Sequence, residues 1–180
     1  MKKVILIHGN GGGTGHDHWF PDVKKEIEKL GIACLAPDFP DSELARAKYW
    51  LPYLENELQA DEDTILVGHS SGAVAAMRYA EAHKIFGSIL VAAYYTDLGY
   101  EDEKKSGYFD RPWHWEDIKE NQRWTVVFAS NDDPYIPIEQ PEFIASQLGA
   151  EPHKLPGRGH FGSDAPVFPE LVDVIKDHMK

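Results

Sequence analysis

The sequence is poor in cysteine, in positive charge and in long apolar runs. Its single cysteine, Cys34, excludes a disulfide within the chain and favours a reducing, cytoplasmic setting. Lys and Arg number 18 against 30 Asp and Glu, so we expect no basic surface for nucleic acid or for anionic membranes. No run approaches the ~18 apolar residues of a membrane helix. The first run, Val4–Ile7, is shorter than the ~7–15-residue core of a signal peptide.

The hydrophobic content of the sequence is typical of a globular chain. Hydrophobic residues make up 42% of 180 residues, which predicts one domain over residues 1–180. Short apolar runs predict strands at Val4–Ile7, Ala33–Ala36, Thr64–Val67, Ser88–Ala92, Thr125–Ala129 and His153–Leu155. Amphipathic or alanine-rich stretches predict helices over residues 20–31, 41–58, 71–83, 141–149 and 169–180. This alternation predicts an α/β fold with a six-stranded, mostly parallel sheet and helices on both faces.

Residues 94–123 interrupt the alternation because they are too polar and irregular for a core element. They nevertheless carry aromatic residues, among them Tyr95 and Trp113, and His114 lies between two tryptophans. Two compatible roles are open: the aromatics pack the segment onto the domain, or some also wall a substrate pocket. The segment begins at the carboxyl end of a predicted strand, where parallel sheets bind ligands. Tyr95, Trp113 and His114 are therefore candidate pocket residues.

Residues 68–72, GHSSG, match the motif G-x-S-x-G. By chance alone, about one chain in twenty of this length would match it. Here, however, a predicted strand precedes the motif and a helix of small residues follows, which is the setting of a nucleophile elbow. The crossing backbone needs glycine two residues before and after the nucleophile, which selects Ser70 over Ser71. The Ser71 N–H is then a candidate oxyanion donor, and His69 is either a packed turn residue or a pocket residue.

A serine nucleophile needs a general base, which an oriented histidine supplies. His160 is best placed, because it follows the last predicted strand in a glycine-rich loop. The acid is expected after the fifth strand, in the usual order serine, acid, histidine. Asp132 and Asp133 both lie there, and we favour Asp133 because the proline after it biases it to an extended conformation. Asp97 and Asp164 are less favoured acids, the latter because it is close to His160 in sequence.

The first predicted strand leads into a glycine-rich loop, HGNGGGTGH, at residues 8–16. The second oxyanion N–H is expected from this loop, from Asn10 or alternatively from Gly11, although a flexible surface turn is another interpretation. A dinucleotide site with Asp38 on the ribose is disfavoured, because the loop contains no G-x-G-x-x-G. His16 and His18 lack a convincing third ligand. We therefore expect neither a metal nor a cofactor.

Several stretches together resemble a known family. They are HGNGGG (8–13), GHSSGAVAAMRYAE (68–81), SGYFDRPWHWE (106–116), NDDPYIP (131–137) and GRGHF (157–161). The chain is similar, nearly end to end, to the retinoblastoma-binding protein 9-like small serine hydrolases. The resemblance implies a three-layer α/β-hydrolase sandwich without the first two antiparallel strands of that fold and without a large cap. It also implies a triad of Ser70, Asp133 and His160.

Two positions depart from the family. Its vertebrate member was linked to pocket proteins through an L-x-C-x-E motif, but here Ala60 replaces the cysteine within Leu58–Glu62. Binding to the retinoblastoma protein is therefore not expected. In addition, His8 opens the first loop where relatives have proline.

The sequence thus predicts a serine hydrolase that acts on small-molecule esters, or on amides or thioesters, through an acyl-enzyme. The alternative is a catalytically weak binding or scaffold protein of the same fold, because intact motifs do not prove turnover.

Overall fold

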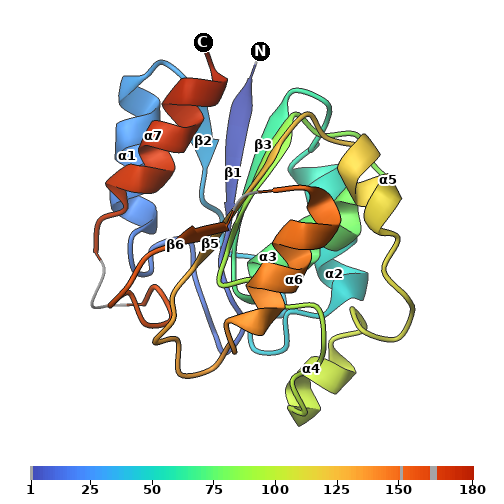
Figure 1. Ribbon diagram of the computed structural model, residues 1–180. Coiled ribbons are helices and arrows are strands. Elements are labelled where there is room, and N and C mark those ends of the chain that lie inside the picture. Colours follow the sequence, from blue (N-terminus) through green and yellow to red (C-terminus); the bar gives the residue numbers. More distant parts are fainter. Residues whose placement is uncertain (1, 151, 163–165) are drawn as a thin grey trace.

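The computed structural model describes residues 2–150, 152–162 and 166–180 (Figure 1). A six-stranded sheet in the order β2-β1-β3-β4-β5-β6 forms its centre, and every neighbouring pair is parallel. The strands are β1 (Lys3–Ile7), β2 (Ala33–Leu35), β3 (Thr64–His69), β4 (Gly87–Val91), β5 (Thr125–Ala129) and β6 (Pro152–Lys154). Each lies within two residues of a predicted strand at both ends, so the predicted sheet is confirmed.

Helices cover both faces of the sheet. They are α1 (Phe20–Lys29), α2 (Ala47–Pro52), the π-helix η1 (Tyr53–Glu57), α3 (Ser71–Ala80), α4 (Glu101–Lys105), α5 (Trp115–Glu120), α6 (Glu139–Leu148) and α7 (Pro169–His178). In Figure 1, α1 and α7 lie together on one face, while α2, α3, α5 and α6 cover the other. The predicted three-layer α/β arrangement is therefore confirmed. None of the helices in the described part of the chain is both long and apolar enough to cross a membrane.

The central strands are buried on both sides, as parallel strands between two helix layers must be. Ile65, Leu66 and Val67 of β3 are all completely buried. Helix α3 is buried along its whole length because its many alanines and its glycine let it approach the sheet closely. This close approach fixes the position of the turn between β3 and α3.

The predicted helix over residues 41–58 begins later than expected, at Ala47. The reason is a turn at Asp41, whose φ is +55° and whose carboxylate accepts hydrogen bonds from the Arg46 backbone and guanidinium. Pro52 lies inside the helical stretch, and η1 follows it with an i→i+5 bond from the Leu58 N–H to the Tyr53 carbonyl (3.0 Å). The helix therefore changes type after Pro52, since proline supplies no N–H.

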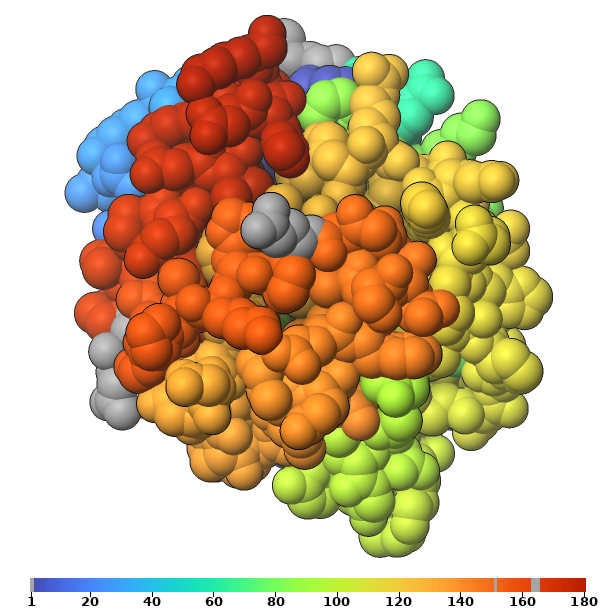
Figure 2. Space-filling model, viewed as in Figure 1, coloured from blue at the N-terminus to red at the C-terminus, as the bar shows by residue number. Residues whose placement is uncertain are grey.

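The topology brings two strand ends together. The chain passes from β1 outward to β2 and then returns to β3 on the other side of β1. The carboxyl ends of β1 and β3 therefore lie at the switch point of the sheet, where such folds bind ligands. Helix α4 projects at this end of the molecule, at the bottom of Figures 1 and 2.

Candidate active site

Ser70 lies on a strained turn between β3 and α3. Its φ and ψ are +55° and −119°, a conformation that residues with a side chain rarely adopt. The two flanking glycines are sterically required. A Cβ on Gly68 would lie 2.3 Å from the Gly72 carbonyl oxygen, and one on Gly72 would lie 2.1 Å from that of Ile7. The turn has the geometry of a nucleophile elbow and carries Ser70 to the wall of a cavity.

Asp133 and His160, which are 27 positions apart in sequence, are brought into contact. The Oδ2 atom of Asp133 lies 2.7 Å from Nδ1 of His160. The other oxygen, Oδ1, accepts the backbone N–H groups of Tyr135 (2.9 Å) and Ile136 (3.0 Å). Since a carboxylate only accepts, Nδ1 of His160 carries the proton and Nε2 is left as a base. His160 lines the same cavity as Ser70.

The alternative acids make other contacts. The carboxylate of Asp132 accepts hydrogen bonds from the Ser130 hydroxyl and from the Gly159 N–H (3.1 Å), so it holds the loop before His160. Asp97 closes a turn by accepting the Gly99 N–H at 2.8 Å. Asp164 lies outside the described residues.

His69 is a neutral, buried brace for His160. Its Nε2 lies 2.7 Å from the backbone carbonyl of His160, and because a carbonyl only accepts, Nε2 must carry the proton. Burial, together with the nearby His160, lowers the pKa of His69 to about 3. The ring centroids of His69 and His160 are 5.0 Å apart, and His69 also lines the cavity. Both interpretations of the sequence thus apply, since His69 is packed in the turn and faces the pocket.

The glycine-rich loop after β1 packs against the elbow. A Cβ on Gly9 would lie 3.4 Å from Cβ of Ser70, so glycine lets the loop backbone approach the nucleophile. His8 accepts the Phe39 N–H at Nε2 (2.9 Å), and its Nδ1 lies 2.8 Å from the Gly9 carbonyl. Burial lowers the pKa of His8, in keeping with a neutral ring that braces this loop.

Several backbone amides among the described residues of this region are free to bind an oxyanion, and they include the two expected from the sequence. Among the described residues, the N–H groups of Asn10 and Ser71 have no hydrogen-bond acceptor. The N–H of Gly11, the alternative donor, is already bonded to the Glu43 carbonyl at 3.0 Å. Asn10 lines the cavity, and Ser71 is the first residue of α3. Their placement fits the donor pair expected from the sequence.

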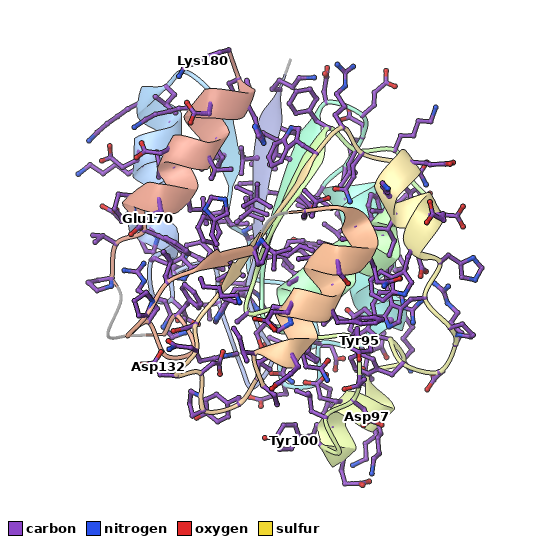
Figure 3. The ribbon with its side chains drawn as sticks, viewed as in Figure 1. Tyr95, Asp97, Tyr100, Asp132, Glu170 and Lys180 are labelled. Carbon is purple, nitrogen blue, oxygen red and sulfur yellow. The ribbon has the colours of Figure 1, made fainter. Side chains whose placement is uncertain are left out.

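The cavity that holds Ser70 and His160 has a volume of about 360 Å³. Its lining includes Tyr94, Tyr100, Tyr135 and the buried carboxyl group of Glu103. Figure 3 shows Tyr100 beside α4, at the same end of the molecule as Asp132. Tyr100 and Tyr135 are both about half exposed, so they stand at the mouth of the cavity.

The structure does not bring three of the pocket candidates to this cavity, since Tyr95, Trp113 and His114 are not among the described residues that line it. Tyr95 stacks on Phe143 of α6 with ring centroids 4.3 Å apart, so its ring packs against that helix. The adjacent Tyr94 faces the cavity instead.

Trp113 and His114 belong to an anchored loop. The Arg78 guanidinium lies 3.6 Å from the Trp113 ring centroid and donates hydrogen bonds to the carbonyls of Tyr108, Arg111 and Pro112. His114 is exposed, and its Nδ1 lies 3.2 Å from Asp117. The aromatic residues of this part of the segment therefore pack it onto α3.

Two features weighed from the sequence have other partners. Asp38, the possible ribose ligand, accepts the Gly15 N–H at 2.9 Å. His18 lines the cavity with its ring centroid 5.7 Å from that of His69. Among the described residues, no three His, Cys, Asp or Glu side chains are grouped as a metal site.

A strained serine at a strand-to-helix turn, an acid–histidine pair and free amides beside it define the α/β-hydrolase class. Comparison with known proteins agrees with this class. Residues 4–173 match the family described as serine hydrolase, so the chain belongs to that family and is a serine hydrolase.

Individual relatives extend this result. The chain is 48% identical over 176 residues to serine hydrolase RBBP9 of Rattus norvegicus, covering 97% of this chain and 94% of the relative. The crystal structure of the ydeN gene product from B. subtilis is 27% identical, with a TM-score of 0.90 and 99% of both chains covered. Est1E from Butyrivibrio proteoclasticus with bound ferulic acid has a TM-score of 0.78 at 15% identity, covering 99% of this chain and 88% of Est1E, and supports the fold alone.

Proposed function

We propose that this serine hydrolase cleaves small, uncharged carboxylic esters by a Ser70–His160–Asp133 mechanism. The observation that carries the proposal is the 2.7 Å contact between Asp133 and His160 beside the strained Ser70. Ser70 Oγ attacks the ester carbonyl carbon while Nε2 of His160 takes its proton, and Asp133 holds the protonated Nδ1. The free N–H groups of Asn10 and Ser71 stabilise the tetrahedral oxyanion. His160 then protonates the leaving alcohol, and water releases the acyl group by the same steps.

The cavity supports small and uncharged substrates. Its volume of about 360 Å³ is at the lower end of ligand pockets, which span roughly 300–1,000 Å³. Its described lining residues include the carboxyl groups of Asp17, Asp102 and Glu103 but no Lys or Arg. An anionic substrate group would therefore meet like charge without a partner. Amides and thioesters share the same mechanism and belong in the same substrate panel.

The test is hydrolysis of a panel of neutral p-nitrophenyl esters by the wild-type protein and by Ser70→Ala. We expect turnover by the wild type and its loss in the variant. A wild-type protein that hydrolyses none of the panel, and that holds a protein partner stably in pulldown, would favour the scaffold alternative.

We also propose that the protein is cytoplasmic and has no nucleic-acid partner. Cys34 is a free, buried core residue, and burial raises the pKa of its thiol to about 12. The net charge of −12 disfavours phosphate backbones. Fractionation of cells that express the tagged protein tests the location.

A further inference from the structure

Glu103 is a buried carboxyl group beside the proposed oxyanion hole. Only 6% of the residue is exposed, and it lines the cavity that contains Ser70. Its neighbours on α4 are exposed instead of buried, since Glu101 and Lys104 form an ion pair on the outside of the same short helix. A buried carboxyl group is costly unless it is hydrogen-bonded, so the partners of Glu103 are informative.

The partners of Glu103 lead to the two segments that supply the free amides. The Asn10 side chain donates from Nδ2 to Oε1 of Glu103 at 2.8 Å. The Tyr94 hydroxyl also faces the Glu103 carboxyl group closely enough that each group shifts the pKa of the other. Tyr94 in turn lies 3.0 Å from Oγ of Ser71. One carboxyl group thus connects the loop after β1 with the first residue of α3.

The protons in this network can be assigned. An ionised Glu103 only accepts, so both Asn10 and Tyr94 donate to it. Because the Tyr94 hydroxyl then directs its proton at Glu103, its oxygen accepts a hydrogen bond from the Ser71 hydroxyl. Burial raises the pKa of Glu103, while the bonds from Tyr94 and Asn10 oppose that rise. Burial and the nearby Glu103 charge raise the pKa of Tyr94, so its hydroxyl keeps its proton.

We propose that Glu103 is a positioning residue for the oxyanion hole of the proposed hydrolase. It contacts neither the nucleophile nor the base. It holds Asn10 through its side-chain amide, and Ser71 through Tyr94, so that their two backbone N–H groups point at one place. Misplacing a catalytic group by about 1 Å can cost about 10²-fold in rate. The inference rests on the proposed function, because it assumes that these amides bind an oxyanion.

The chain offers a variant that separates hydrogen bonding from charge. In Glu103→Gln, the amide oxygen can accept from Asn10 and the amide nitrogen can donate to Tyr94, which then donates to Ser71. Glu103→Ala leaves Asn10 and Tyr94 without this partner. Glu101→Ala is the matched control, since it removes a carboxylate from the exposed side of the same helix.

The experiment measures three quantities for the wild type and these variants. They are kcat and KM on p-nitrophenyl butyrate, and the rate of covalent labelling by a fluorophosphonate, which reports serine attack without deacylation. For Glu103→Ala we expect kcat and the labelling rate to fall about 10- to 100-fold, with KM changed by about twofold or less. Glu103→Gln should regain most of the loss, and Glu101→Ala should match the wild type.

Three further measurements keep the result decisive. Circular dichroism melts show whether each variant folds. If Glu103→Ala does not fold, Tyr94→Phe removes one hydroxyl from the network and should lower kcat without raising KM. In the double variant Asn10→Ala/Glu103→Ala, the losses should be less than additive, because both changes break the same hydrogen bond.

Two results would overturn the proposal. One is a folded Glu103→Ala protein with the kcat of Glu101→Ala. The other is a Glu103→Gln protein as slow as Glu103→Ala, which would mean that charge rather than hydrogen bonding matters. A wild-type protein without Ser70-dependent hydrolysis would instead refute the proposed function itself.

Discussion

Replacing Asp133 by asparagine tests the proposed triad at the contact that carries it. In Asp133→Asn, the side-chain oxygen can still accept the backbone N–H groups of Tyr135 and Ile136, as Oδ1 of Asp133 does now. The new side-chain NH₂ then faces Nδ1 of His160 in place of Oδ2. Because that NH₂ only donates, Nδ1 must give up its proton, and Nε2 carries it instead. His160 in this tautomer cannot accept the proton of Ser70.

The expected loss follows from this change of tautomer. In a Ser-His-Asp triad the same exchange lowers kcat about 10⁴-fold, or about 5.4 kcal/mol of transition-state stabilisation. The assay is kcat on a neutral p-nitrophenyl ester, with Asp132→Asn as the matched control. Asp132 bonds Ser130 and Gly159 but not the His160 ring, so its variant should lose about tenfold or less. Equal losses in the two variants, or an Asp133→Asn protein within tenfold of the wild type, would refute the reasoning.

Two further predictions concern stability. The pKa of His69 is about 3 in the folded protein against ~6.5 when unfolded. Between these pH values the unfolded chain binds more protons than the folded protein. The free energy of unfolding should therefore fall as the pH drops from ~6.5 towards 3. His69→Gln keeps a donor for the His160 carbonyl but cannot titrate, and urea melts should show a slope smaller by up to ~1.4 kcal/mol per pH unit; an unchanged slope would contradict the assignment. Gly72→Ala places a Cβ 2.1 Å from a backbone oxygen and should lower the free energy of unfolding by more than about 2 kcal/mol. Gly31→Ala is the control, because its Cβ would have no atom within 4 Å. It should lower the free energy of unfolding by about 1 kcal/mol, from its φ of +78° alone. Similar losses for both glycine variants in denaturant melts would show that contact at the elbow does not matter.

The sequence predicted the sheet and the strand-to-helix turn at Ser70 well because both depend on local patterns. Apolar runs of four or five residues between amphipathic stretches predict buried parallel strands, and the flanking glycines alone separate Ser70 from Ser71. Asp133 was also favoured from a local signal, the proline after it. In each case the deciding information lies within a few residues in the chain.

The residues that sequence reasoning missed depend on long-range packing. Glu103 lies in the run EDEKK, which looks like an exposed charged turn of helix, and no local signal distinguishes it from Glu101. Its burial follows from how residues 94–123 fold back over the loop after β1. Tyr94 lines the cavity whereas Tyr95, the predicted pocket residue, packs on α6, and no local signal indicates which way either side chain points. Trp113 lies away from the cavity because Arg78 holds its loop against α3.

The most direct test of the central claim is to locate the covalent adduct after labelling with a fluorophosphonate. Peptide mass spectrometry should place one adduct on Ser70 in the wild-type protein. Labelling should disappear in Ser70→Ala and persist in Ser71→Ala, which keeps its backbone N–H. An adduct on Ser71, or undiminished labelling of Ser70→Ala, would contradict the account.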